Sequence, residues 1–174
     1  MVQDDFAERP PGYYRTSLQV ALMYVATAGI YGIYWLIRSR YAANKRLGLK
    51  DTSWYFWLTL FVPIVFLFTI FSTLSLLEKS CRARLPDKKI VPFYIFGIFY
   101  FVLMSLSRLP EPYNLAFFTG CIPIAIMQHY SYEVDIIAST AYPHKARFNW
   151  IEWIILIIGF IFVIFVSIAS FLRL

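Results

Sequence analysis

The charged residues of this chain are clustered, and they leave five long segments that carry no charge at all. These apolar segments are 18 to 26 residues long and cover residues 16–37, 52–77, 90–107, 112–132 and 153–172. A helix needs about 20 apolar residues to cross the hydrocarbon core of a bilayer. The spacing therefore predicts an all-α fold, namely a polytopic membrane helical bundle with four or five true spans.

The composition supports the same class and leaves no room for a large soluble domain. Apolar residues make up 60% of the chain and charged residues 15%, whereas about 25% of the residues are charged in an average soluble domain. The stretches between the apolar segments reach at most 20 residues, far below the roughly 50 that an independent domain needs. We expect an acidic, proline-rich tail over residues 1–15 and a single transmembrane domain over residues 16–174.

Two short loops, residues 38–50 and 79–89, hold ten of the 16 lysines and arginines. Basic residues beside apolar segments are typical of cytoplasmic loops, where anionic headgroups attract each of them by about 1 kcal/mol. We expect these loops to dock anionic lipid headgroups or a partner protein, whereas direct binding of nucleic acid is not favoured. The candidate residues are Arg38, Arg40, Lys45 and Arg46 in the first loop and Lys79, Arg82, Arg84, Lys88 and Lys89 in the second.

The topology depends on how residues 52–77 cross the membrane. If all five apolar segments span, the basic residues divide almost evenly between the two sides, which is unusual under the positive-inside rule. If the chain instead turns back at Pro63, both basic loops lie on one side. We favour one uninterrupted helix over 52–77, because irregular backbone at membrane depth needs shielding by protein. The even division of charge then has no explanation.

Two sequence echoes suggest an internal repeat. Ile-Tyr-Gly-Ile-Tyr-Trp at 30–35 recurs as Ile-Phe-Gly-Ile-Phe-Tyr at 95–100, and Thr-x-x-Val-Pro-Ile at 59–64 recurs as Thr-x-x-Ile-Pro-Ile at 119–124. The matches predict a duplicated two-helix unit followed by an extra C-terminal helix. Ala28 and Gly32 form a pair of small residues four apart, which predicts a close helix–helix contact on one face of a helix over 16–37.

One polar cluster stands near the end of the fourth apolar segment. It contains His129, Glu133 and Asp135, and the first two are four residues apart and share a helix face. Ionisable groups at membrane depth are expensive, so they face a partner, a cavity or the interface. The cluster is either a proton relay or metal site, to which His144 contributes, or the point where the helix emerges into water. We favour the second interpretation, and we expect no metal and no cofactor.

Three further residues have simpler assignments. Cys81 and Cys121 make neither a disulfide framework nor a spaced metal set, so we expect inert thiols. Glu152 is expected to pair with Lys145 or Arg147.

The run Gly-Ile-Tyr-Gly-Ile-Tyr-Trp at 29–35, followed by basic residues and by Asn44, Lys45 and Leu47, resembles a family of small bacterial membrane proteins. That family is classed as a domain of unknown function and shares the pattern Gly-Ile-Tyr-x-x-Tyr-Trp. The resemblance covers about residues 18–80. It implies a location in the bacterial inner membrane, and it implies no known activity or catalytic residue.

These observations favour a non-enzymatic membrane anchor, sensor or scaffold that forms a homo-oligomer and works with a co-expressed partner protein. The alternative is a small transporter or channel-like subunit, which the repeat and the matching prolines Pro63 and Pro123 favour. An intramembrane enzyme that uses His129 and Glu133 is a third possibility.

Overall fold

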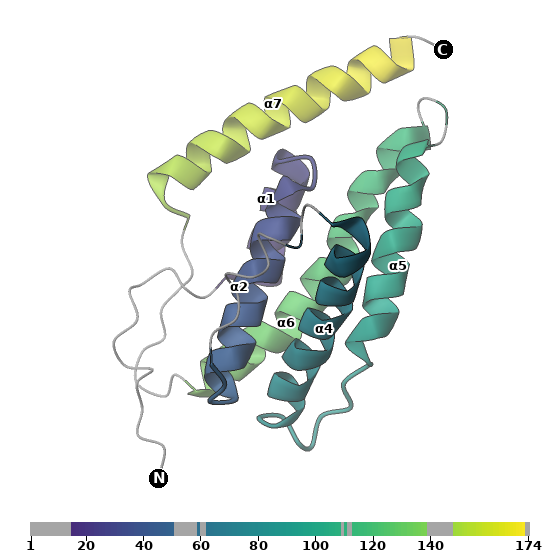
Figure 1. Ribbon diagram of the computed structural model, residues 1–174. Coiled ribbons are helices and arrows are strands. Elements are labelled where there is room, and N and C mark those ends of the chain that lie inside the picture. The colour runs from purple at the N-terminus through teal and green to yellow at the C-terminus, as the bar shows by residue number, and fades with distance from the viewer. Residues whose placement is uncertain are drawn as a thin grey trace.

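The computed structural model describes residues 15–50, 59, 62–108, 110, 113–138 and 148–172, and within these ranges the regular elements are all helices. The all-α prediction is therefore confirmed, and the tail predicted for residues 1–15 lies outside the described residues except for Arg15. Figure 1 shows the helices, whose bounds are α1 (Ser17–Ala26), α2 (Ile30–Arg46), α4 (Pro63–Arg82), α5 (Phe93–Ser105), the short 3-10 helices η1 (Leu106–Arg108) and η2 (Tyr113–Gly120), α6 (Cys121–Ala138) and α7 (Trp150–Leu172).

Helices α2 and α4 run in the same direction. Arg40 Nη1 donates to Thr73 Oγ1 over 3.0 Å, and Arg46 Nη1 donates to Ser80 Oγ over 3.5 Å, so the paired residue numbers rise together. The end of α2 and the beginning of α4 consequently lie at opposite ends of the bundle (Figure 1). A single uninterrupted helix over 52–77 is therefore wrong, since α4 begins at Pro63. Proline suits this first position because it has no N–H to leave unpaired.

Helix α6 is parallel to α2, whereas α5 is antiparallel to α4. The indole of Trp35 on α2 donates to Gln128 on α6, and Arg46, further along α2, donates to Asp135, further along α6, so the paired residue numbers rise together. On α5, the N–H of Phe93 donates to Glu78 near the end of α4, and the ring of Phe101 lies 5.9 Å from that of Phe71, a residue nearer the beginning of α4. Three helices thus end on the side of the bundle where α5 begins.

The first apolar segment folds as two helices joined by a tight turn. Helix α1 ends at Ala26, and Ala28 and Gly29 take the left-handed conformation with φ of 47° and 87°. The Gly29 N–H donates to the carbonyl of Tyr24 over 2.9 Å, which closes the end of α1. Thr27 accepts from the N–H of Tyr31 over 2.9 Å and so supports the start of α2. The prediction of one helix over 16–37 is therefore wrong.

The turn also separates the two small residues that were expected to form one contact face. Ala28 lies in the turn and is exposed, while Gly32 is buried on α2. A Cβ at Gly32 would lie 3.1 Å from the ring of Tyr24 and 3.5 Å from Ile124. Gly32 therefore leaves room beside α2 for the ring of Tyr24 from α1 and for the side chain of Ile124 from α6, but Ala28 takes no part in a shared helix face.

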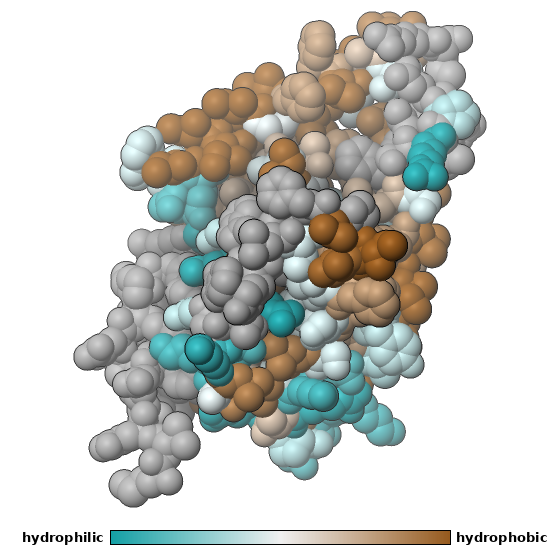
Figure 2. Space-filling view, in the orientation of Figure 1, coloured by the Kyte–Doolittle hydropathy of each residue, from teal (hydrophilic) through white to brown (hydrophobic). Residues whose placement is uncertain are grey.

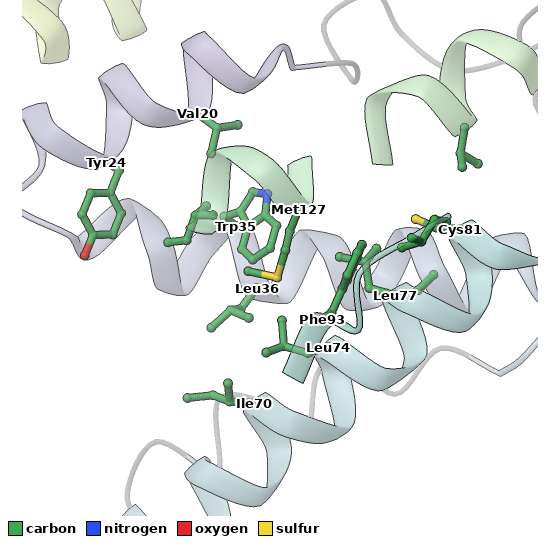
Figure 3. Close-up of a cluster of buried hydrophobic side chains, with 14 residues drawn as sticks. Val20, Tyr24, Trp35, Leu36, Ile70, Leu74, Leu77, Cys81, Phe93 and Met127 are labelled. Carbon is green, nitrogen blue, oxygen red and sulfur yellow. The ribbon is translucent and has the colours of Figure 1, made fainter. Parts of the chain in front are cut away.

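The buried core lies where α1, α2, α4, α5 and α6 meet. Figure 3 shows its side chains, and its largest fully buried members include Tyr24, Phe93, Leu74, Leu77 and Met127. Gly97 on α5 is part of this contact, because a Cβ there would lie 2.6 Å from Leu74. Close packing of this kind gains dispersion energy over many small contacts.

The two-helix repeat is not confirmed. The echo at 30–35 lies on α2, which is parallel to the next long helix, α4. The echo at 95–100 lies on α5, which is antiparallel to the next long helix, α6, because Phe93 at the beginning of α5 stacks on Tyr130 in the second half of α6. No single rotation superimposes the two pairs.

Two helices among the described residues are long and apolar enough to cross a membrane, and five such spans are not confirmed. These helices cover Ile64–Arg82 and Trp150–Leu172. The second, α7, packs on α1 and lies apart from α4 and α5 along most of its length (Figure 1). A Cβ at Gly159 would collide with the Ala26 carbonyl of α1. Most of the remaining surface of α7 is apolar and exposed, as the brown surface along this helix in Figure 2 shows.

The contact between α1 and α7 predicts that Gly159→Ala destabilises the protein. The added methyl group must push the two backbones apart, which typically costs about 1–3 kcal/mol. Thermal unfolding in detergent measures the effect. Ile164→Phe is the matched control, because it adds bulk to α7 at a side chain that is 57% exposed. Equal unfolding midpoints for Gly159→Ala and the wild type would show that the contact does not hold α7.

Candidate functional site

A buried ion pair joins α2 to α6. Arg46 Nη2 lies 2.7 Å from Asp135 Oδ1, 2.8 Å from Ser131 Oγ and 3.2 Å from the Ser131 carbonyl oxygen. The side chains of Arg46 and Asp135 are only 3% and 12% exposed. Together with the bond from Arg46 to Ser80, the guanidinium thus ties α2 to both α6 and α4.

The sequence positions Arg46 inside the bundle through helical spacing. Gly32, Ser39 and Ala43 are buried on α2 at intervals of seven and four residues, and Arg46 follows three residues later on the same face. The expectation that Arg46 faces headgroups is therefore wrong. The long side chain of Arg46 therefore faces α6, where Ser131 and Asp135 accept hydrogen bonds from its guanidinium.

Arg46 and Asp135 each stabilise the charged form of the other inside the bundle. Moving two charges out of water carries a large desolvation penalty, which only good geometry and further hydrogen bonds offset. Asp135 and Ser131 supply these bonds to Nη2, and Ser80 supplies one to Nη1. The Nε atom of Arg46 is buried and has no hydrogen-bond partner among the described residues.

A polar cavity of about 80 Å³ lies beside this pair, between α1, α2 and α6. Trp35 Nε1 donates to Gln128 Oε1 over 2.7 Å, and Gln128 Nε2 donates to the carbonyl of Arg15 over 2.6 Å, so both side chains are fixed. Arg15 and Glu152 form an ion pair that also lines the cavity. A space of this size and polarity holds a few waters or one small polar solute.

The predicted polar cluster divides between the outside and the inside of the bundle. His129 is 58% exposed at its side chain, and its Nε2 lies 3.1 Å from Glu133 Oε1. Glu133 also accepts from Lys88 Nζ over 2.6 Å. Asp135 points inward to Arg46 and does not join them. His144 lies outside the described residues, within which no three His, Cys, Asp or Glu side chains are grouped to hold a metal.

The two basic segments meet at one end of the bundle, which follows from the parallel course of α2 and α4. We call this region, residues 40–50 and 79–89, the basic end, and teal side chains mark it at the foot of the molecule in Figure 2. Arg38 lies higher, at the middle of α2, with its guanidinium 5.8 Å from the ring centre of Tyr34. Arg108 lies at the opposite end, after α5.

Several cations of the basic end have acidic or carbonyl partners. Arg82 contacts Glu78 over 2.8 Å and the Ile90 carbonyl over 2.7 Å, and Lys88 contacts Glu133. Lys45 is half-buried, whereas Lys50, Lys79, Arg84 and Lys89 are exposed. The basic end therefore contains both cations that are paired with acidic residues and cations that face solvent.

The structure also places the residues with simpler assignments. Glu152 pairs with Arg15, while Lys145 and Arg147, its expected partners, lie outside the described residues. Cys81 is buried in the core and Cys121 is half-buried, and neither forms a disulfide.

No family model, curated protein or solved structure matches this chain. The resemblance of residues 29–35 to a family of small bacterial membrane proteins therefore stays a prediction.

The buried pair predicts strong coupling between Arg46 and Asp135. Asp135→Asn leaves the guanidinium without its counter-charge, and such a change costs about 3–5 kcal/mol at a buried site. In a double-mutant cycle with Arg46→Met, measured by unfolding in detergent, the two changes should be far from additive. The cycle of His129→Ala with Glu133→Ala is the control, and its coupling should stay below about 0.5 kcal/mol because the His129 side chain is 58% exposed to solvent. Similar coupling in both cycles would contradict the assignment.

Proposed function

We propose that this protein is a non-enzymatic subunit of the bacterial inner membrane, which acts as an anchor or scaffold for a partner protein. The observation that carries the proposal is the meeting of both basic segments at one end of a bundle with two membrane-length apolar helices. Under the positive-inside rule such an end faces the cytoplasm. The docking face for a soluble partner is then the basic end.

The buried pair of Arg46 and Asp135 suits a scaffold because it fixes the position of α2 relative to α6. An ion pair inside a bundle adds little net stability, but a wrong register leaves its charges unpaired. Arg46 and Asp135 would therefore specify the register of α2 against α6. The solvent-facing cations Lys79, Arg84 and Lys89 follow from that register and would be presented to a partner in a fixed arrangement.

The partner that fits this end is an acidic soluble protein. Complementary charge speeds encounter and selects the orientation of docking. The exposed apolar face of α7 offers a separate contact, with lipid or with a second copy of the chain, in keeping with the expected homo-oligomer. Both contacts are compatible with an anchor or a sensor that signals through its partner.

A small transporter subunit is the second candidate, and the polar cavity favours it. Charged groups within a bundle commonly mark a solute or ion pathway. The cavity is lined by three arginines, two carboxylates and the fixed amide of Gln128. Flux of small anions and cations into proteoliposomes that stays at the level of empty vesicles would exclude this candidate and leave the scaffold.

The proposed orientation predicts which side of the membrane each segment faces. In a variant without Cys81 and Cys121, single cysteines at Leu49, Ala83 and Pro110 report three positions. An impermeant maleimide should leave Leu49→Cys and Ala83→Cys unlabelled in intact cells and label both in inverted vesicles. Pro110→Cys should show the reverse pattern. Labelling of Leu49→Cys and Ala83→Cys from opposite sides would contradict the parallel arrangement of α2 and α4.

The scaffold function predicts a stoichiometric partner that depends on the basic end. Cross-linking in cells, followed by purification of the tagged protein, should capture one soluble protein of acidic composition. The double variant Arg84→Glu/Lys89→Glu should insert normally and reduce the captured amount about tenfold or more, a loss that corresponds to about 1.4 kcal/mol. Arg108→Glu, at the other end, is the control and should change nothing. A wild-type protein that purifies without any partner would contradict the proposal.

A further inference from the structure

A groove runs between α2 and α4 on the outer surface of the basic end. Its volume is about 440 Å³, and both helices supply its walls. The lining residues are Arg40, Asn44, Leu49 and Lys50 on one side and Ser72, Ser75, Leu76 and Lys79 on the other. Three cations thus face this basic groove, and the lining residues that the structure describes include no carboxylate.

The described lining of the groove is all cationic among its charged residues, which differs from the other charged sites of the bundle. The polar cavity contains Asp135 and Glu152, which balance two of its arginines. At the rest of the basic end, Arg82 and Lys88 lie against Glu78 and Glu133. Among the residues that the structure describes, an anion that approaches the basic groove therefore meets three cations.

The wall that α4 contributes changes in polarity along its length. Ile64, Phe68, Ser72, Ser75 and Lys79 follow one another at intervals of four, four, three and four residues, so they form one stripe on the helix surface. Ile64 and Phe68 are 69% and 74% exposed, and the two serines and the lysine are exposed as well. The stripe is apolar near the beginning of α4, carries hydroxyls in the middle and ends in a cation.

The sequence of apolar, hydroxyl and cationic side chains along α4 matches the parts of a phospholipid in the cytoplasmic leaflet, from its acyl chains to its phosphate. Acyl chains meet apolar side chains, the glycerol esters meet hydroxyls, and the phosphate meets cations. Arg40 is fixed at the groove by its bond to Thr73 over 3.0 Å, and arginine is well suited to phosphate because its guanidinium offers several donors in one plane. Basic pockets between helices at the cytoplasmic side are suited to anionic headgroups.

We propose that the basic groove binds one anionic phospholipid. Its phosphate lies among Arg40, Lys50 and Lys79, its ester region lies at the two serines, and an acyl chain follows the apolar part of the α4 stripe. The site rests on the proposed membrane location of the bundle. It goes beyond general attraction of a basic end to the bilayer, because it specifies one groove, one stoichiometry and one class of headgroup.

The test is native mass spectrometry of the detergent-purified protein in mixtures of phosphatidylglycerol and phosphatidylcholine. The wild type should keep one phosphatidylglycerol per chain and prefer it over phosphatidylcholine by about tenfold. Arg40→Gln/Lys79→Gln should lose this preference. Arg84→Gln/Lys89→Gln removes the same charge from the same end but outside the groove, and it should keep the preference. Lys79→Gln alone changes only an exposed side chain, and it should weaken the preference without disturbing the fold.

Several results would overturn the inference. Equal retention of the two lipids by the wild type would show that the groove does not select an anionic headgroup. Equal losses in the two double variants would show general attraction rather than a site. Displacement of phosphatidylglycerol by millimolar inorganic phosphate would show a free-phosphate site rather than a lipid site. Extraction of the protein from membranes by alkaline carbonate would instead contradict the proposed membrane location, and this result is distinguishable from loss of lipid selectivity in a protein that stays integrated.

Discussion

The pairing of Arg46 with Asp135 is the constraint on which the rest of this structure depends. A charged group inside an apolar bundle needs a counter-charge and hydrogen bonds at short range, and these two residues supply both across α2 and α6. Their contact fixes the position of α2 relative to α6 along the helix axes. The bond from the same guanidinium to Ser80 extends the constraint to α4, so one side chain aligns three helices that run in the same direction.

The parallel alignment of α2 and α4 determines where the basic side chains lie on the surface of the bundle. Because α2 and α4 are parallel and in register, the basic residues that follow each helix converge on one end. Pairs such as Arg82 with Glu78 neutralise part of that end, while the charged lining residues that the structure describes in the groove between the two helices are all cations. The proposed partner contact and the proposed lipid site thus both follow from the arrangement of the helices.

The fold class could be predicted from the sequence because it depends on composition and on the length of uncharged segments, which are local properties. The course of the helices could not. The first apolar segment breaks at a left-handed turn of Ala28 and Gly29, and α4 begins at Pro63 and packs parallel to α2. Both features go with contacts between helices, which the length of an uncharged segment does not report. A cluster of basic residues predicts one exposed surface, whereas the spacing of Arg46 from Ser39 and Ala43 places Arg46 on the buried face of α2.

The parallel arrangement of α2 and α4 is the central claim, and a distance between two spin labels tests it most directly. Labels at Leu49 and Ala83 stand just beyond the ends of α2 and α4, both at exposed positions. Electron paramagnetic resonance on the detergent-purified protein should give a separation well below about 30 Å, the length of a 20-residue helix such as α4. A separation of about 30 Å or more would place the two basic segments at opposite ends and contradict the account.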